Sequence, residues 1–387
     1  MNGVWLLARR HVTRHRGRSL LLIACLTVTI SLPGATRLLV TQFETRLSER
    51  ARSTPLIVGA AGSRFDLALH ALYFRGQPPR EASFGEVTRI QETGYGEALP
   101  LFARFRAAGA PIVGTTFDYL IHRRSQLAAG EFVSRHGDCV LGAAVADRLG
   151  LGPGDSLLSE PENVFDIDGQ FPLRMHVTGV LRSCSSPDDE AVFVSLETAW
   201  IIAGIGHGHA AKQQREDAAT TGHDASTVEY TEITDDNAAS FHFHGKQSDF
   251  PITAIIVVPH DERSETLLLG QYLAEDDPSQ ILQSAEVVDE LMTFVVRIRS
   301  LFETAFLVMT AVTLALLGLL TLLAIRLRKR EFDTLRRIGG SRFLIAQLVG
   351  AELLILLSVS CVLTCVVLAG LSALLPQLSL HTLAGGL

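Results

Sequence analysis

The chain has 387 residues, of which 47% are apolar and only 19% are charged, and its mean hydropathy is +0.27. So much apolar surface excludes an intrinsically disordered chain, and five cysteines in a chain of this length exclude a small disulfide-stabilised scaffold. The net charge of −7 conceals two basic segments, 9–18 and 326–342, which a long acidic region separates. Such segments are typical of the cytoplasmic ends of membrane helices, whereas a nucleic-acid-binding domain carries its basic residues on a folded face.

Three uncharged apolar runs predict membrane-spanning helices, because each approaches the roughly 20 residues that a helix needs to cross a bilayer. The positive-inside rule places both basic segments in the cytoplasm. The first run also resembles the apolar core of a cleaved signal peptide, which is the alternative interpretation. We predict a cytoplasmic N-terminus (1–18), a transmembrane helix (19–41), an extracytoplasmic region (42–303), a second transmembrane helix (304–325), a cytoplasmic segment (326–345), a third transmembrane helix (346–375) and an extracytoplasmic tail (376–387).

The extracytoplasmic region begins and ends with helical patterns, at residues 38–53 and 285–304. We expect the adjoining spans to continue outward through them as a stalk, with two short helices lying on the bilayer as the alternative. Between them, apolar runs of strand length, rich in valine and isoleucine, alternate with helical patterns. The strand runs are 55–58, 111–114, 174–181, 190–196 and 251–259, and the helical patterns are 143–151 and 262–273. The predicted fold class is therefore an α-helical membrane protein with a large mixed α/β extracytoplasmic domain.

Two cysteines, Cys139 and Cys184, lie outside the apolar runs. They would be able to form a disulfide in an oxidising compartment, but their spacing does not show that their Cα atoms lie close together. Two free thiols are the alternative.

Residues 204–248 are polar, small and charged, which predicts a mobile insertion with little to bury. The insertion contains His207, His209, His223, His242 and His244. Two pairs of these are separated by one residue, a spacing that places both rings on one face of a strand, and neutral imidazole binds zinc. The insertion is therefore a candidate for a weak zinc site. The alternative is a flexible loop whose histidines merely titrate near neutral pH.

The sequence contains no phosphate-binding loop, dinucleotide fingerprint, zinc-protease motif or hydrolase nucleophile motif. The acidic cluster Asp188, Asp189 and Glu190 is interpreted as a solvated turn. We therefore expect no catalytic residues and no enzymatic activity from the chain alone.

The cytoplasmic segment and the start of the third span read RLRKREFDTLRRIGGSRFLIAQLVGAELLIL (326–356). This stretch resembles the cytoplasmic loop of FtsX/MacB-type ABC transporter permeases, where the motif R-E-x-x-x-L-R-x-x-G-[AG]-S-R precedes an acid that opens the next span. Segments 55–75, 137–157 and 176–200 resemble the family's periplasmic core domain, so the resemblance covers most of the chain. The matching loop positions are Arg330, Glu331, Leu335, Arg336, Gly339, Gly340, Ser341, Arg342 and Glu352.

The resemblance implies that these loop residues couple the chain to a separate cytoplasmic ATPase, and an amphipathic segment suits such docking. It implies a permease subunit for export or mechanotransmission, paired with a like or unlike permease in the bacterial inner membrane, in contact with lipid. A periplasmic partner protein is also implied, and no nucleic acid. ATP and magnesium would belong to the partner subunit, so no cofactor is expected in this chain, apart from the candidate zinc site at the insertion.

Two expectations qualify this interpretation. Family members usually have four spans, so we expect either a truncated product or a three-span variant. Glu352 opens a span, where an acid is costly unless paired, and Arg326 or Arg342 are its candidate partners, with a carboxylate that reaches back to the membrane interface as the alternative. The alternative function is a zinc-binding membrane receptor or metal-handling protein that acts through the histidine-rich insertion without an ATPase.

Overall fold

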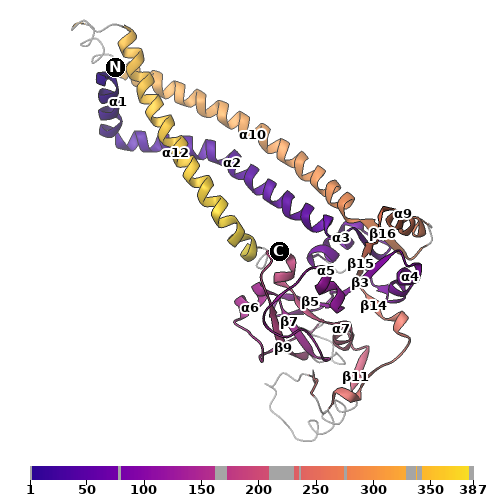
Figure 1. Cartoon of the computed structure of the whole chain (residues 1–387). Coiled ribbons are helices and arrows are strands. Elements are labelled where there is room, and N and C mark those ends of the chain that lie inside the picture. Colours follow the sequence, from indigo (N-terminus) through magenta and orange to yellow (C-terminus); the bar gives the residue numbers. More distant parts are fainter. Residues whose placement is uncertain are drawn as a thin grey trace. The chain divides into compact units, whose positions relative to one another are not determined.

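The computed structural model describes residues 2–76, 80–161, 172–208, 231–234, 237–273, 277–327, 337 and 342–382. The chain forms two compact units: Met1–Arg46 with Leu291–Leu383, and Leu47–Glu290 with Ala384–Leu387. Figure 1 shows long helices in the first unit and a mixed α/β domain in the second. The long helices and the mixed α/β domain agree with that part of the predicted fold class.

The first unit consists of helices, and three of the described helices are long and apolar enough to cross a membrane. Many of their apolar side chains are exposed, as Leu307 (72%) and Val362 (65%) illustrate. The helices are α1 (Asn2–Arg14), α2 (Arg16–Arg52), α10 (Ser284–Leu327) and α12 (Arg342–Thr382). The three predicted apolar runs all lie within α2, α10 and α12. Both α2 and α10 extend beyond their runs, through the segments predicted to continue the spans.

Small and polar residues lie where these helices meet. The hydroxyl oxygens of Thr29 and Thr313 are 3.4 Å apart, and the hydroxyl of Ser360 donates to the carbonyl of Ile23 at 3.3 Å. A Cβ on Gly34 would approach Leu368 to 3.0 Å, so α2 and α12 come close at this glycine. Such contacts are typical of helix packing in membranes, where small residues and hydroxyls hold helices together.

A single large sheet organises the α/β domain. Its strands follow the order β12-β9-β7-β10-β5-β3-β15-β1-β16, with β4 added on β5 and with β6 and β8 added on β9. The nine strands of the main path are β1 (Leu56–Ala60), β3 (Gly96–Phe102), β5 (Ala110–Thr115), β7 (Asp138–Leu141), β9 (Leu173–Leu181), β10 (Val192–Ser195), β12 (Thr231–Glu232), β15 (Ala254–Pro259) and β16 (Ser279–Gln283). The added strands are β4 (Arg106–Ala107), β6 (Leu127–Gly130) and β8 (Ser156–Leu158).

Short helices cover this sheet, and the central strands are apolar on both faces as a result. Ile255, Ile256 and Val257 of β15 are all fully buried, a pattern expected where helices cover both faces. Trp200 is the largest fully buried side chain, and its indole N–H donates to the carbonyl of Pro251 at 2.8 Å. The covering helices are α3 (Arg64–Tyr73), α4 (Gly85–Thr93), α5 (Phe117–His122), α6 (Ala143–Leu149), α7 (Leu196–Ile202) and α9 (Glu262–Gln271).

The chain enters and leaves the domain through neighbouring strands. β1 follows closely after α2, and β16 leads directly into α10. The two strands pair antiparallel, with Leu56 opposite Gln283 and Ala60 opposite Ser279. The backbone N–H of Ser284 also donates to the carbonyl of Pro55 at 3.1 Å. The first residue of β1 and the last residue of β16 are therefore adjacent.

Parts of the polar insertion fold onto the domain, which corrects the prediction that 204–248 has little to bury. β12 joins the main sheet beside β9, and Ile233 is only 4% exposed. β11 (Gly206–Gly208) pairs with β13 (Phe241–Phe243), whose two phenylalanines pack against the core. Three apolar anchors spaced through a polar sequence were too sparse to predict a packed segment.

His70 in α3 gives the domain a pH dependence. The side chain is 3% exposed, and neither ring nitrogen has a hydrogen-bond partner of good geometry among the described residues. Burial lowers the pKa of His70 from 6.5 to about 4, and the backbone of Ala103 and Arg75 offsets only part of that effect. The folded domain therefore holds His70 neutral where the unfolded chain already takes up a proton.

We predict that the free energy of unfolding falls as pH drops from about 6.5 to about 4, by up to about 3 kcal/mol from this residue. The pKa of His70 is lowered in the folded state, so the loss begins at the unfolded pKa and is complete below the folded one. Urea unfolding of the full chain in detergent, followed by Trp200 fluorescence with Trp5 replaced by Phe, measures it. His70→Leu should flatten the pH profile, and His260→Gln, at an exposed histidine, should not. An unchanged profile in His70→Leu would contradict the assignment.

Candidate functional site

Most of the predicted coupling residues lie outside the described residues: Arg330, Glu331, Leu335, Arg336, Gly339, Gly340 and Ser341. Arg342 begins α12, and Glu352 lies one-quarter of the way along it. The structure therefore describes the two helices that flank the coupling segment, α10 and α12, and not the motif itself.

Glu352 lines a small cavity among α2, α10 and α12. The cavity holds about 30 Å³, enough for a water molecule, and Arg18 of α2 is the one basic residue in its lining. Its walls are otherwise mostly aliphatic, including Leu22, Leu317 and Leu356. Arg326 and Arg342 were the partners expected for Glu352 from the sequence; in the structure Arg18, from the first basic segment, lines the same cavity as Glu352.

The predicted histidine cluster is only partly described. His209 and His223 lie outside the described residues, while the backbones of His207 in β11 and His242 in β13 are paired. The Nε2 atoms of His242 and His244 are 3.1 Å apart. Among the described residues, no three histidine, cysteine, aspartate or glutamate side chains gather as metal ligands would.

Cys139 and Cys184 do not form the disulfide considered from the sequence, and both are free. Cys139 is buried in β7, where desolvation raises the pKa of its thiol. Cys184 lies in the loop after β9, and its sulfur contacts the Ser186 hydroxyl at 3.0 Å and the Asp189 carboxylate at 3.3 Å. The two thiols therefore occupy different surroundings, the core and an exposed loop.

The most strongly charged cluster in the domain interior surrounds Arg50, at the end of α2. Arg50 is 8% exposed and binds the carboxylate of Asp188 with two hydrogen bonds of 2.8 Å, one to each oxygen. Its Nε donates to the carbonyl of Leu72 at 3.1 Å, and its Nη2 donates to the Tyr119 hydroxyl at 3.0 Å. That hydroxyl donates in turn to Asp188 at 2.7 Å. We call these three side chains, Arg50, Tyr119 and Asp188, the helix anchor.

The helix anchor is electrically balanced. Burial alone would raise the pKa of Asp188, but Arg50, together with Arg123 and the Tyr119 hydroxyl, holds that pKa below its usual value. Burial raises the pKa of Tyr119 to about 12, so its hydroxyl stays protonated and can donate. A bidentate guanidinium–carboxylate pair is among the strongest hydrogen-bonded contacts in proteins. It tolerates burial only because nearly every polar atom has a partner.

The acidic cluster that was interpreted as a solvated turn is in fact buried, which corrects the sequence analysis. Asp188 and Asp189 are 3% and 1% exposed and lie in the short helix η1 (Pro187–Glu190). Asp189 accepts hydrogen bonds from the backbone of Cys184 and Ser185, and Glu190 pairs with Arg75. The error arose because the cationic partners are far away in the sequence: Arg50 and Asp188 are separated by 138 residues.

Further contacts hold the residues that follow the helix anchor. The ring Nε2 of His122 lies 3.0 Å from the carbonyl of Ser53. Arg123 donates to the hydroxyls of Ser53 at 2.9 Å and Thr54 at 2.7 Å. On the other side of η1, Gly142 packs so closely that a Cβ there would lie 2.3 Å from the carbonyl oxygen of Asp188. The turn that carries Asp188 is therefore fixed on both sides.

The chain was compared with known families, curated proteins and solved structures. No protein-family model and no curated protein matches it. Solved structures do: the periplasmic region of MacB from Actinobacillus actinomycetemcomitans has 10% identity and a TM-score of 0.35, over 62% of this chain and 92% of that chain. The extracellular domain of the noncanonical ABC-type transporter YknZ from Gram-positive bacteria has 9% identity and a TM-score of 0.31, over 59% and 99%.

A third similar structure is a domain of a permease protein from Porphyromonas gingivalis, with 13% identity and a TM-score of 0.26 over 52% of this chain and 77% of that chain.

We predict that Arg50→Met destabilises the domain by about 3–5 kcal/mol, because it leaves the Asp188 carboxylate buried without its cation. The double variant Arg50→Met with Asp188→Leu should recover most of that loss, since neither charge is then buried. Arg52→Met, at an exposed arginine one half-turn further along α2, is the matched control and should have little effect. Denaturant unfolding of the full chain by Trp200 fluorescence measures each. If Arg50→Met lowered the free energy of unfolding by less than about 1 kcal/mol, the pair would behave like a solvent-exposed one, and the prediction would be wrong.

Proposed function

We propose that the chain is the permease subunit of an ABC transporter and transmits movement from a separate cytoplasmic ATPase to its extracytoplasmic α/β domain. The observation that carries the proposal is the placement of the coupling motif. Residues 326–342 join two of the three helices that are long and apolar enough to span a membrane, α10 and α12. A basic motif between two spans is where a cytoplasmic partner would act.

The helix anchor supports the second half of the proposal. A movement that reaches the domain along α2 is useful only if the end of this helix cannot slip within the domain. Arg50 meets this requirement, because rotating the last turn of α2 would separate two buried charges. Packed elements with fixed internal contacts move as rigid bodies, which is how domain-scale switching proceeds.

In this proposal the chain lies in the bacterial inner membrane with its N-terminus in the cytoplasm and pairs with a second permease subunit. ATP hydrolysis belongs to the partner, and the chain itself performs no chemistry. The cargo, or the periplasmic protein that receives the movement, contacts the α/β domain. A shared fold does not by itself determine that choice, because one fold serves many functions.

We predict that a nucleotide-binding subunit co-purifies with the full chain extracted from its native membrane with nucleotide present, and that Glu331→Lys or Leu335→Asp abolishes this. Each variant changes the polarity of a docking segment whose apolar and charged faces both contribute. Matched controls are Glu92→Lys and Leu273→Asp, the same substitutions at exposed positions of the α/β domain. Quantitative mass spectrometry of the eluate provides the measurement. Equal loss in variants and controls, or no nucleotide-binding subunit with the wild type, would refute the proposal.

A further inference from the structure

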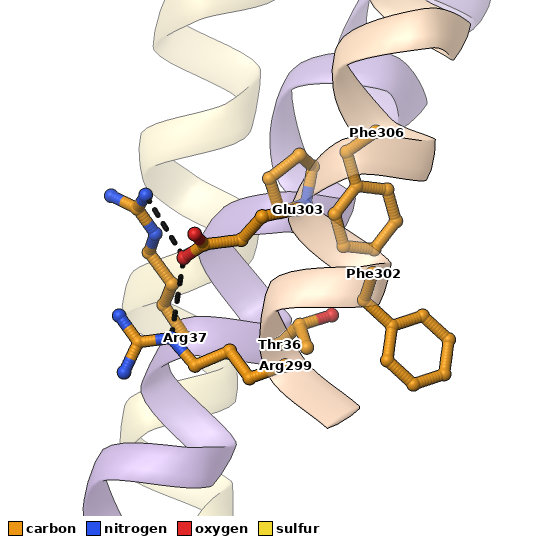
Figure 2. A pocket seen from close by; sticks show the side chains of 7 residues that line it. Thr36, Arg37, Arg299, Phe302, Glu303 and Phe306 are labelled. Atoms are coloured by element: carbon orange, nitrogen blue, oxygen red, sulfur yellow. Dashed lines mark hydrogen bonds and ion pairs between the residues drawn. The ribbon is translucent and has the colours of Figure 1, made fainter. Parts of the chain in front are cut away.

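A small cavity lies between α2 and α10, beside the point where the apolar run of each helix meets charged residues. Its volume is about 90 Å³. In Figure 2, Glu303 reaches toward two guanidinium groups on one side, and the rings of Phe302 and Phe306 lie on the other. The lining residues are Pro33, Thr36 and Arg37 of α2 and Arg299, Phe302, Glu303 and Phe306 of α10.

The polar side of this cavity has an excess of positive charge. One carboxylate oxygen of Glu303, Oε1, contacts both Nη2 of Arg37 and Nε of Arg299, each at 3.2 Å. Among the described residues, no other carboxylate pairs with either arginine. A guanidinium group offers several N–H donors in a planar fork, so most donors of the two arginines remain available. One carboxylate therefore leaves room, in charge and in hydrogen bonds, for a second anion.

The apolar side continues onto an exposed hydrocarbon surface. The rings of Phe302 and Phe306 are stacked with centroids 6.3 Å apart, and Phe302 is 51% exposed. Beyond them α10 exposes Leu307 and Val308. A ligand with its anionic group at the arginines would thus lay apolar chains along α10. A free inorganic anion has no hydrocarbon chain and would leave this apolar surface uncovered.

We propose that this cavity binds the phosphate group of an anionic phospholipid from the outer leaflet, with Arg37 and Arg299 on the phosphate and the acyl chains along α10. The inference rests on the transmembrane placement proposed above. On the cytoplasmic side of membranes, basic pockets between helices bind anionic head groups, and each lysine or arginine near such a surface contributes roughly a fivefold gain in affinity. The same phosphate chemistry applies to the two arginines at the outer ends of these helices.

Glu303 acts as a positioning residue in this site. Its carboxylate holds both guanidinium groups together, and it also competes with the phosphate for their charge. Glutamine would keep a hydrogen-bond acceptor in the same place and remove the competing charge. Substituting either arginine should therefore weaken lipid binding, whereas substituting Glu303 should strengthen it. A purely structural ion-pair cluster would not give effects of opposite sign.

The experiment is native mass spectrometry of the full chain in detergent, titrated with phosphatidylglycerol and, separately, with zwitterionic phosphatidylethanolamine. We expect phosphatidylglycerol to be retained preferentially. Arg37→Ala and Arg299→Ala should each weaken its retention about fivefold, and Glu303→Gln should strengthen it by a similar factor. Arg297→Ala is the matched control, because Arg297 lies on the same helix, is exposed and does not line the cavity. It should leave retention unchanged.

Three results would overturn the proposal. Equal loss in Arg297→Ala and Arg299→Ala would indicate non-specific attraction to a basic helix. Weaker retention of phosphatidylglycerol by Glu303→Gln would show that the cluster is only a structural ion pair. Displacement of the lipid by inorganic phosphate at millimolar concentration would assign the site to a free anion instead.

The same preparations separate this inference from the proposed function. Arg37 and Arg299 lie at the opposite end of the apolar runs from residues 326–342, so their variants should retain the nucleotide-binding subunit. Loss of lipid with the subunit retained supports the inference. Unchanged lipid binding with the subunit retained refutes the lipid site alone, and a missing subunit in the wild type refutes the proposed function alone.

Discussion

A buried ion pair fixes the end of α2 within the α/β domain. Arg50 and Asp188 are both almost fully excluded from water, so no solvent molecule can replace a partner that moves away. The carbonyl of Leu72, the Tyr119 hydroxyl and the tightly packed η1 turn all depend on this arrangement. The cost of an unpaired charge in the interior makes the contact nearly all-or-none. The last turn of α2 therefore has one stable register in the domain.

This constraint gives the proposed function a mechanical basis. Hydrophobic contacts alone allow neighbouring elements to slide, because their energy depends little on direction. A bidentate pair has a fixed direction as well as a fixed length. The antiparallel pairing of β1 with β16 adds a second directional contact, since a slip by one residue would turn every side chain of a strand to the other face. Within the domain, the last turn of α2 and the strand that leads into α10 are therefore both held by directional contacts.

Local patterns predicted the parts of the structure that depend on local sequence. The three apolar helices and strands such as β9 and β15 were identified because their apolar periodicity is continuous. The predicted helical segments 38–53 and 285–304 also lie in α2 and α10, except for residue 53, which follows the end of α2. β3 was missed because Gly96 and Pro100 interrupt its pattern, although it is buried beside β15.

The functional clusters were harder to predict, because they combine residues that are distant in the sequence. From the sequence alone, Asp188 has the features of a surface acid, and Arg37 simply ends an apolar run. The structure pairs Asp188 with Arg50 and Arg37 with Glu303. No pattern within either segment indicates the pairing. The coupling motif was recognised for the opposite reason, since its residues are contiguous, and it remains a prediction because it lies outside the described residues.

The adjacency of β1 and β16 also bears on how such chains diversify. Because the α/β domain begins and ends on neighbouring strands, it is topologically a single insertion into a helical hairpin formed by α2 and α10. Domains whose ends lie close together are readily exchanged. Recombination at residues 53–55 and 283–284 would replace the whole domain without changing the spacing of the helix ends, which strand pairing sets at about 5 Å. The helical part and the domain are therefore free to evolve as separate modules, provided that any new domain supplies a buried carboxylate for Arg50.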